Sequence, residues 1–210
     1  MEKRALILVD IQRDFLPGGA LAVPDADAIL PLVRLLIERN EMVVATQDWH
    51  PPEHGSFAAN HPPGHKPGDI IDLYGLQQVL WPVHCVQNTP GAQFSDALWD
   101  KYERINKIFR KGTDASVDSY SGFFDNGRRK TTGMGEWLKT QGVDALTIVG
   151  LATDYCVKFT ALDAVELGFQ TTVVSDACRA VNLSEGDGER ALKDMQAAGV
   201  HVITSKEIGL

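Results

Sequence analysis

Short apolar segments alternate with helical patterns along the whole chain, and this alternation restricts the fold more than any other feature. The expected strands lie at residues 5–9, 42–46, 105–109, 145–150, 171–174 and 201–204. Helical periodicity is expected at residues 28–38, 134–141, 153–168 and 189–198. Strands that alternate with helices are typical of a mainly parallel sheet with helices on both faces. The sequence therefore predicts an α/β protein, a three-layer α/β/α sandwich.

Length and charge narrow the class of protein further. A chain of 210 residues fits a single domain over residues 1–210, since one core keeps growing up to about 250–300 residues. The formal net charge of −8 argues against nucleic acid or an anionic membrane as partner. No apolar run reaches the ~20 residues of a membrane span. The N-terminal MEKRALILVD also lacks the apolar region of a signal peptide, so we expect a cytoplasmic protein.

A cysteine stands where an expected strand turns into a helix, in the segment ALTIVGLATDYCVKFTALDA. Cys156 falls in the first helical turn, where the helix dipole favours a thiolate and free N–H groups can bind an oxyanion. The alternative is a small buried cysteine with no chemical role. We interpret Cys85 and Cys178 in that way, and three distant cysteines suit a reducing compartment.

Polar side chains follow the ends of several expected strands. Asp10, Asp48, Lys111 and the turn that carries Cys156 each come after such an end. Because the carboxyl ends of parallel strands share one edge of the sheet, we expect these groups in one crevice. Taken alone, Asp10 could cap a turn and Lys111 could be a solvated charge. Together they predict a cysteine nucleophile with an acid–base partner.

The segment QDWHPPEHGSF has the composition of a metal site. Asp48 and His50 are two residues apart, so on an extended segment both side chains point the same way. His84 is the favoured third ligand, and His54 is an additional candidate. One carboxylate and two imidazoles suit a catalytic divalent ion, and Zn²⁺, Fe²⁺ and Mn²⁺ all accept this set. The alternative is an exposed polar loop.

Residues 51–90 show little periodicity and are rich in Pro, Gly and His. An irregular stretch of this length is usually functional or a lid. His61 and His65 lie among Pro and Gly residues, and we assign them to this loop.

Six segments together resemble the nicotinamidase branch of the isochorismatase-like cysteine hydrolases: LILVDIQRDF, TQDWHPPEHGSF, WPVHCVQNTPGA, FRKGTD, DSYSGFFD and VGLATDYCVKFTALDA. The resemblance extends over residues 6–180. It implies a six-stranded, mainly parallel sheet and the hydrolysis of nicotinamide to nicotinate and ammonia, in NAD salvage. It also implies one divalent metal ion, with Zn²⁺ favoured and Fe²⁺ or Mn²⁺ as alternatives.

The resemblance assigns the catalytic roles. The family's triad falls on Asp10, Lys111 and Cys156. Its oxyanion donors would be the backbone N–H groups of Ala152 and Cys156, often with a cis peptide before the alanine. The expected reaction runs through a thioester on the cysteine.

The resemblance also assigns the binding residues. The metal ligands fall on Asp48, His50 and His84, with His54 near the metal directly or through water. The substrate ring would be enclosed by Phe15, Trp81 and Tyr120. Without the resemblance these aromatic residues would be ordinary packing residues.

Other functions stay open at this point. A related amidohydrolase for an N-carbamoyl or ureido substrate would share the triad without needing the metal set. Isochorismatase proper lacks the nucleophilic cysteine, and a binding protein with the same fold would have little reason to keep every role. Nicotinamide is the expected small-molecule partner, in a monomer or a homo-oligomer.

Overall fold

The computed structural model describes residues 2–210 and is built around a six-stranded sheet. The strands follow the order β5-β2-β1-β6-β7-β8, and each neighbouring pair is parallel. Their bounds are β1 Arg4–Val9, β2 Val43–Asp48, β5 Lys107–Lys111, β6 Ala145–Leu151, β7 Gln170–Arg179 and β8 His201–Ile203. The predicted parallel sheet is confirmed. Among the described residues, no helix has the length and apolar character needed to cross a membrane.

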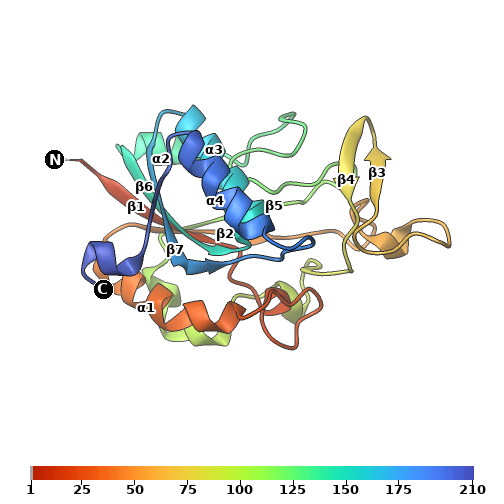
Figure 1. Ribbon diagram of the computed structural model, residues 1–210, viewed down its shortest axis with the longest axis horizontal. Helices are drawn as coiled ribbons and strands as arrows, with labels where there is room; N and C mark the ends of the chain where they lie inside the picture. Colours follow the sequence, from red (N-terminus) through yellow and green to blue (C-terminus); the bar gives the residue numbers. More distant parts are fainter. Residues whose placement is uncertain (1) are drawn as a thin grey trace.

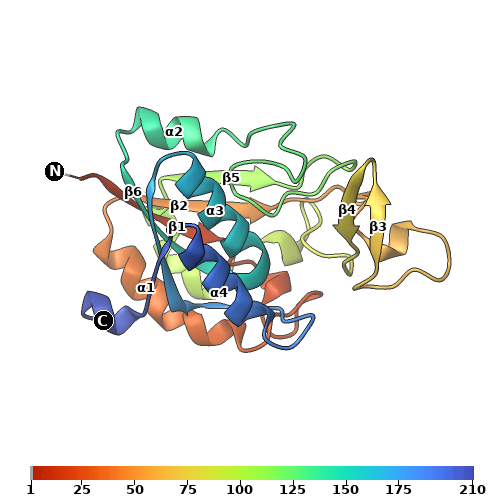
Figure 2. The same cartoon turned by 45° about the horizontal axis from the view of Figure 1, so that its top comes forward.

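Helices cover both faces of this sheet, as Figures 1 and 2 show. One face carries α1 (Leu30–Arg39), and the other carries α2 (Met134–Thr140), α3 (Lys158–Glu166) and α4 (Asp187–Ala197). Side chains of one strand alternate between two apolar layers, because successive residues of a strand point to opposite faces. In β1, Leu6 and Leu8 join the layer under α1, whereas Ile7 and Val9 join the layer under the other helices. The three-layer sandwich is therefore confirmed.

Two strands differ most in extent from the prediction. The predicted strand at 105–109 begins only at Lys107, because the side chain of Asn106 takes up the N–H of Val43 at the start of the ladder (2.7 Å). The predicted strand at 171–174 continues to Arg179. Asp176 looked like a strand end, but its carboxylate accepts hydrogen bonds from the N–H and hydroxyl of Ser205.

Regular structure also occurs in regions without a clear sequence pattern. A hairpin of β3 (Ile70–Leu73) and β4 (Leu76–Val79) lies within the segment predicted to be irregular. Its two-residue turn, Tyr74 and Gly75, has positive φ at both positions, which matches the twist of paired strands. Figure 1 shows this hairpin beyond the carboxyl edge of the sheet. A further 3₁₀ helix spans Asp96–Arg104.

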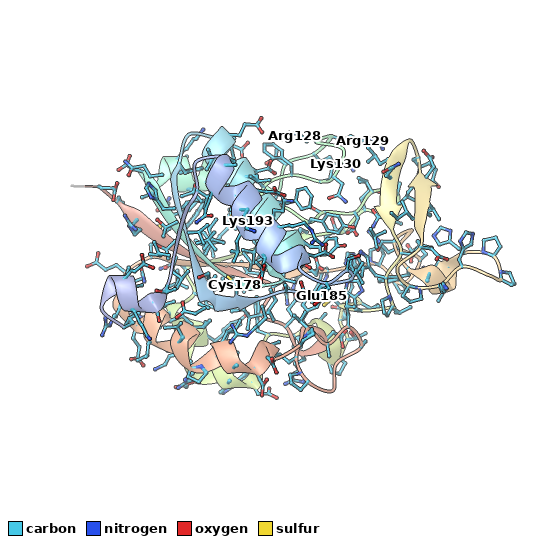
Figure 3. All side chains as sticks on the ribbon, in the orientation of Figure 1. Arg128, Arg129, Lys130, Cys178, Glu185 and Lys193 are labelled. Atoms are coloured by element: carbon cyan, nitrogen blue, oxygen red, sulfur yellow. The ribbon has the colours of Figure 1, made fainter. Side chains whose placement is uncertain are left out.

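A run of three basic residues lies on a surface loop, where Figure 3 labels it. Arg128 pairs with Asp163 and Glu166 (3.0 and 2.9 Å), and Lys130 pairs with Asp114 (2.7 Å). The run is thus largely neutralised by neighbouring carboxylates.

Candidate active site

The polar residues that follow the strands meet at the carboxyl edge of the sheet. Asp48 and Lys111 are the last residues of β2 and β5 and are register partners. Asp10 directly follows β1. Cys156 lies in a π-helical turn, Thr153–Val157, between β6 and α3. The fold therefore brings together the four groups that the strand ends were expected to deliver.

Lys111 is the centre of this cluster. Its Nζ lies 2.8 Å from Asp10 Oδ2 and 2.5 Å from Asp48 Oδ1. The same ammonium donates hydrogen bonds to Cys156 Sγ (3.3 Å) and to the carbonyl oxygen of Ser119 (2.8 Å). One buried cation thus contacts both carboxylates and the thiol.

A threonine of the neighbouring strand fixes Asp10. The backbone of Asp10 is left-handed, with φ 47°, so the chain turns away from β2 at this residue. Its N–H donates to Thr46 Oγ1 (3.2 Å), and the same hydroxyl donates to Asp10 Oδ1 (2.7 Å). The second oxygen, Oδ2, is left to face Lys111.

Burial and ion pairing give the two carboxylates different basicity. Burial raises the pKa of Asp10, and the attraction of Lys111 opposes this only in part. Burial acts on Asp48 in the same direction, but Lys111 and His50 outweigh it and hold the pKa of Asp48 well below its ordinary value. Burial would lower the pKa of Lys111, yet the two aspartates raise it well above the ordinary value. Asp10 is therefore the stronger base beside a permanently charged ammonium.

The surroundings of Cys156 oppose the thiolate that the helix start was expected to favour. Burial raises the pKa of the Cys156 thiol well above its ordinary value; Lys111 opposes this, and the negative charges of Asp10 and Asp48 add to it. The sequence shows the lysine and the helix start, but not the depth of burial or the two carboxylates beside the sulfur. The resting residue is a thiol, so its reaction requires a base next to it.

The other two cysteines make no hydrogen bond to Lys111. All three cysteines are buried and free. Cys178, labelled in Figure 3, lies on β7 in an apolar layer, where burial raises the pKa of its thiol to about 12. Burial raises the pKa of the Cys85 thiol well above the ordinary value as well.

Asp48, His50 and His84 form a compact group beside the thiol. Asp48 Oδ2 lies 3.4 Å from His50 Nε2 and 3.7 Å from His84 Nε2, and the three donor atoms lie within 4.8 Å of one another. His50 Nδ1 contacts the carbonyl oxygen of Gly112 (2.9 Å), and His84 Nδ1 that of Pro82 (2.7 Å). Since a carbonyl only accepts, each Nδ1 carries a proton, and each Nε2 is the nitrogen that faces Asp48 and can bind a metal ion. This donor set fits a divalent metal ion.

His54 lies next to the group but is held differently. Its Nδ1 accepts the N–H of Ser56 (3.2 Å) and contacts the hydroxyl of that serine (2.7 Å). Burial lowers the pKa of His54 to about 4, so the ring is neutral near pH 7 and its proton sits on Nε2. That N–H is buried without a partner among the described residues, and together with His50 and Asp118 it forms a second compact group.

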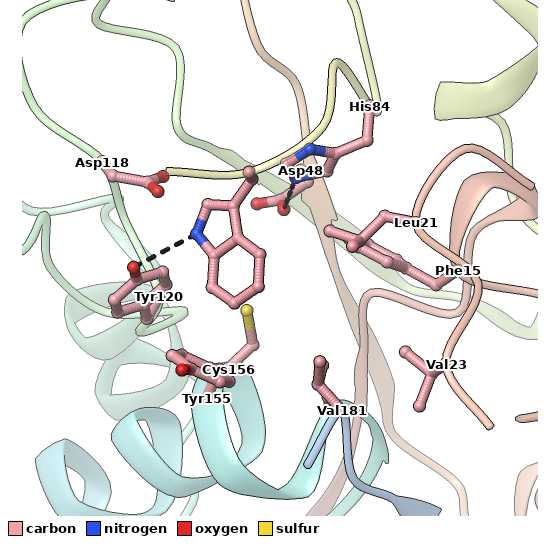
Figure 4. A pocket seen from close by; sticks show the side chains of 12 residues that line it. Phe15, Leu21, Val23, Asp48, His84, Asp118, Tyr120, Tyr155, Cys156 and Val181 are labelled. Atoms are coloured by element: carbon pink, nitrogen blue, oxygen red, sulfur yellow. Dashed lines mark hydrogen bonds and ion pairs between the residues drawn. The ribbon is translucent and has the colours of Figure 1, made fainter. Parts of the chain in front are cut away.

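A pocket of about 400 Å³ opens between the thiol and the metal-binding group (Figure 4). Of the residues singled out from the sequence, its wall contains Phe15, Asp48, Trp81, His84, Tyr120, Ala152 and Cys156. The wall also contains residues that were not predicted from the sequence: Leu21, Val23, Asp118, Tyr155 and Val181. Tyr155 directly precedes the cysteine, and Asp118 opens the segment DSYSGFFD, so both had a positional signal.

Aromatic contacts shape one wall of this pocket. Tyr155 meets Trp81 and Tyr120 edge to face, with ring centroids 4.9 and 5.3 Å apart. Trp81 Nε1 donates to the hydroxyl of Tyr120 (3.3 Å), as the dashed line in Figure 4 shows. The hairpin supports this wall, because Gln78 of β4 donates to both Tyr120 and Asp118 (3.1 Å each). The pocket is therefore rigid and mostly apolar, with polar groups at its base.

The peptide bond between Leu151 and Ala152 is cis, as the resemblance implied. Ala152 and Cys156, the two residues expected to supply oxyanion donors, both line the pocket.

Comparisons with known proteins agree with this geometry. Residues 4–207 match the family model described as the isochorismatase domain. A nicotinamidase of Escherichia coli (strain K12) is 50% identical over 208 residues, which cover 97% of this chain and 96% of that protein. The structure of a nicotinamidase from Acinetobacter baumanii has a TM-score of 0.94 and 47% identity, covering 99% of each chain. The zinc complex of a pyrazinamidase from Pyrococcus horikoshii has a TM-score of 0.75 and 37% identity, covering 96% of this chain and 99% of that one.

Proposed function

The chain belongs to the isochorismatase family, and we propose that it is a nicotinamidase that hydrolyses nicotinamide to nicotinate and ammonia in NAD salvage. The observation that carries this proposal is the pocket itself. The Cys156 thiol, in contact with Lys111, lies at one side, and Asp48 and His84 of the metal-binding group lie at the other. The mostly apolar lining, which includes Phe15, Trp81 and Tyr120, suits a small aromatic amide. The identity to the Escherichia coli relative supports the same substrate.

Asp10 is the acid–base residue of the proposed reaction. It takes the proton of Cys156 while the sulfur attacks the carboxamide carbon, and the raised pKa of Asp10 suits this transfer. The backbone N–H groups of Ala152 and Cys156 hold the oxyanion. Lys111 stays charged and balances the negative charge that builds up around the sulfur.

The same carboxyl group completes the reaction. Asp10 returns its proton to the departing nitrogen as the C–N bond breaks. Ammonia departs, and a thioester remains on Cys156. Asp10 then accepts a proton from water as the water oxygen attacks the thioester carbon. The C–S bond breaks, the sulfur regains its proton, and nicotinate leaves.

Asp48, His50 and His84 hold the proposed metal ion, with Zn²⁺ favoured because the pyrazinamidase from Pyrococcus horikoshii binds zinc. A divalent ion bound there supplies a Lewis acid for the pyridine nitrogen of the substrate. Phe15, Trp81 and Tyr120 enclose the ring and present the amide to the sulfur. His54 acts through its Nε2 proton, which favours a water-mediated role over direct ligation. The three free cysteines support the expected cytoplasmic location.

The decisive experiment is ammonia release from nicotinamide by the purified protein, before and after chelation, with elemental analysis of the sample. We expect turnover that chelation removes and that added Zn²⁺ restores. An N-carbamoyl or ureido compound is the comparison substrate. Turnover of that compound without turnover of nicotinamide, unaffected by chelation, would contradict the proposal and favour the related amidohydrolase.

A further inference from the structure

Strand β1 leaves its neighbour β2 before β2 ends. The two strands are paired up to Leu8 and Ala45, and the chain turns away at Asp10. Strand β2 continues to Asp48, which has a strand neighbour only on the side of Lys111. The N–H and C=O of Asp48 on the other side need partners, because this residue is buried.

The side chain of Gln12 takes the place of the missing strand. Its Oε1 accepts the N–H of Asp48 (2.8 Å), and its Nε2 donates to the carbonyl oxygen of Asp48 (2.9 Å). The second proton of Nε2 goes to the carbonyl oxygen of Ala92 (2.9 Å). Gln12 is fully buried. These partners also fix which end of the amide is oxygen, since the N–H of Asp48 needs an acceptor.

Gln12 holds Asp48, and the orientation of the Asp48 side chain matters because its two oxygens have different partners. Asp48 Oδ1 faces Lys111, while Oδ2 faces His50 and His84. A small rotation of the Asp48 backbone would move both oxygens at once. A side chain that grips the N–H and C=O of the same residue prevents that rotation.

We propose that Gln12 is a positioning residue for the metal site: its amide fixes the main chain of Asp48 and thereby aims the carboxylate at His50 and His84. The inference rests on the proposed metal site and deepens it. Gln12 does not line the pocket, so it acts on the site only through Asp48, and metal affinity is the direct measure of its effect.

Gln47 provides a matched control. It is the residue before Asp48 and is also buried, and its Nε2 donates to the same carbonyl oxygen of Ala92 (2.9 Å). Its Oε1 accepts from Arg110 (3.3 Å), and it makes no hydrogen bond to Asp48. Removing either amide takes one hydrogen bond from Ala92, but only the loss of Gln12 frees the backbone of Asp48.

The test measures the dissociation constant for Zn²⁺ by competition with a chromophoric chelator, on metal-stripped full-length protein. Wild type, Gln12→Met and Gln47→Met are compared below their melting temperatures, which are measured without metal. We expect Gln12→Met to bind Zn²⁺ about 10- to 100-fold more weakly, as is typical when the groups supporting a metal ligand are lost. Gln47→Met should bind like wild type. Saturating Zn²⁺ should restore the turnover of Gln12→Met, since Asp10 and Cys156 are untouched.

Equal Zn²⁺ affinity in Gln12→Met and Gln47→Met would overturn the inference. Gln12→Glu is the second variant: it keeps the shape and the acceptor for the N–H of Asp48 but loses the amide donors, so we expect intermediate affinity. An affinity of Gln12→Glu for Zn²⁺ equal to that of wild type would also overturn the inference. So would failure of both Gln12 variants to fold, because Gln12 would then be a general structural residue.

The outcomes separate this inference from the proposed function. Wild-type protein that binds no Zn²⁺ would refute the metal site, and the role of Gln12 with it. Wild-type protein that binds Zn²⁺ but releases no ammonia from nicotinamide would refute the substrate assignment and leave the role of Gln12 intact.

Discussion

Replacing Lys111 by methionine should destabilise the protein far more than the loss of an ordinary ion pair. The Lys111 side chain is fully buried, as is that of Asp10, and that of Asp48 is 6% exposed. Methionine has a similar length and fills the space, but it leaves two buried carboxylates without their shared cation. Removing one partner of a buried ion pair costs about 3–5 kcal/mol. For a chain of this size the melting temperature falls by about 2–4 °C per kcal/mol, so we expect a loss of about 6–20 °C.

The loss of stability in Lys111→Met should depend on pH in a defined direction. Without the ammonium, burial and mutual repulsion raise the pKa of both Asp10 and Asp48 above their unfolded values of about 3.9. The folded variant then binds more protons than the unfolded chain, so its stability falls as pH rises through the folded pKa values. In wild type the pKa of Asp48 is lowered instead, and the stability from its pairing is lost as pH falls. The difference in the free energy of unfolding between wild type and Lys111→Met should therefore be largest near neutral pH and should decrease on acidification.

Urea unfolding of the metal-free proteins at neutral and mildly acidic pH measures this effect. Lys158→Met is the control, because Lys158 pairs with Asp194 at 2.6 Å on the surface, with side chains 23% and 58% exposed. Its loss should cost only about 0–1 kcal/mol. The buried ion-pair reasoning is refuted if Lys111→Met lowers the free energy of unfolding no more than Lys158→Met does. It is also refuted if the loss in Lys111→Met is the same at both pH values.

Three further substitutions test the proposed roles. Cys156→Ala should abolish ammonia release while elemental analysis finds the same metal content, and residual turnover would contradict the covalent route. His50→Ala should lower the affinity for Zn²⁺ and for nicotinamide in titrations, and unchanged affinity would count against the metal ligand. Asp10→Asn should lower the pKa of Cys156, because the Asp10 charge raises it. Iodoacetamide should then label Cys156 faster than in wild type at neutral pH while turnover stops, and slower labelling would be inconsistent with the electrostatics.

The sheet could be predicted because its signal is local. Strands β2 and β6 are buried along their whole length; β6 reads as a nearly continuous apolar run, and β2 begins as one with Val43, Val44 and Ala45. The residues that follow such runs then fall at the carboxyl edge. Asp10, Asp48 and Lys111 could be placed at one edge without knowledge of the strand order.

The hairpin of β3 and β4 gave no comparable signal. Its strands are short and only partly buried, and Tyr74-Gly75 is not among the turn pairs most typical of hairpins. The pocket wall that the hairpin supports through Gln78 could not be derived for the same reason.

Side-chain contacts across the fold were also beyond the sequence. Gln12 reads as an ordinary loop residue, because nothing local shows that β1 stops short of Asp48. The protonation state of Cys156 depends on the sum of burial and three neighbouring charges. A sequence shows the signs of those charges but not the distances that decide which one dominates.

Asp48 explains why the metal group and the catalytic group, which look like separate motifs in the sequence, form one structure. One of its oxygens faces Lys111 and the other faces both imidazoles. A substitution of Asp48 would therefore disturb the ion pair and the metal site together, and its effect on turnover could not be assigned to either. His50 has no such double role, since its ring nitrogens contact Asp48 and the carbonyl oxygen of Gly112 and make no hydrogen bond to Lys111 or Cys156. Gln12 likewise reaches Asp48 through the main chain alone. Substitution of either residue thus weakens the metal site without removing a charged partner of the ion pair between Lys111 and Asp10.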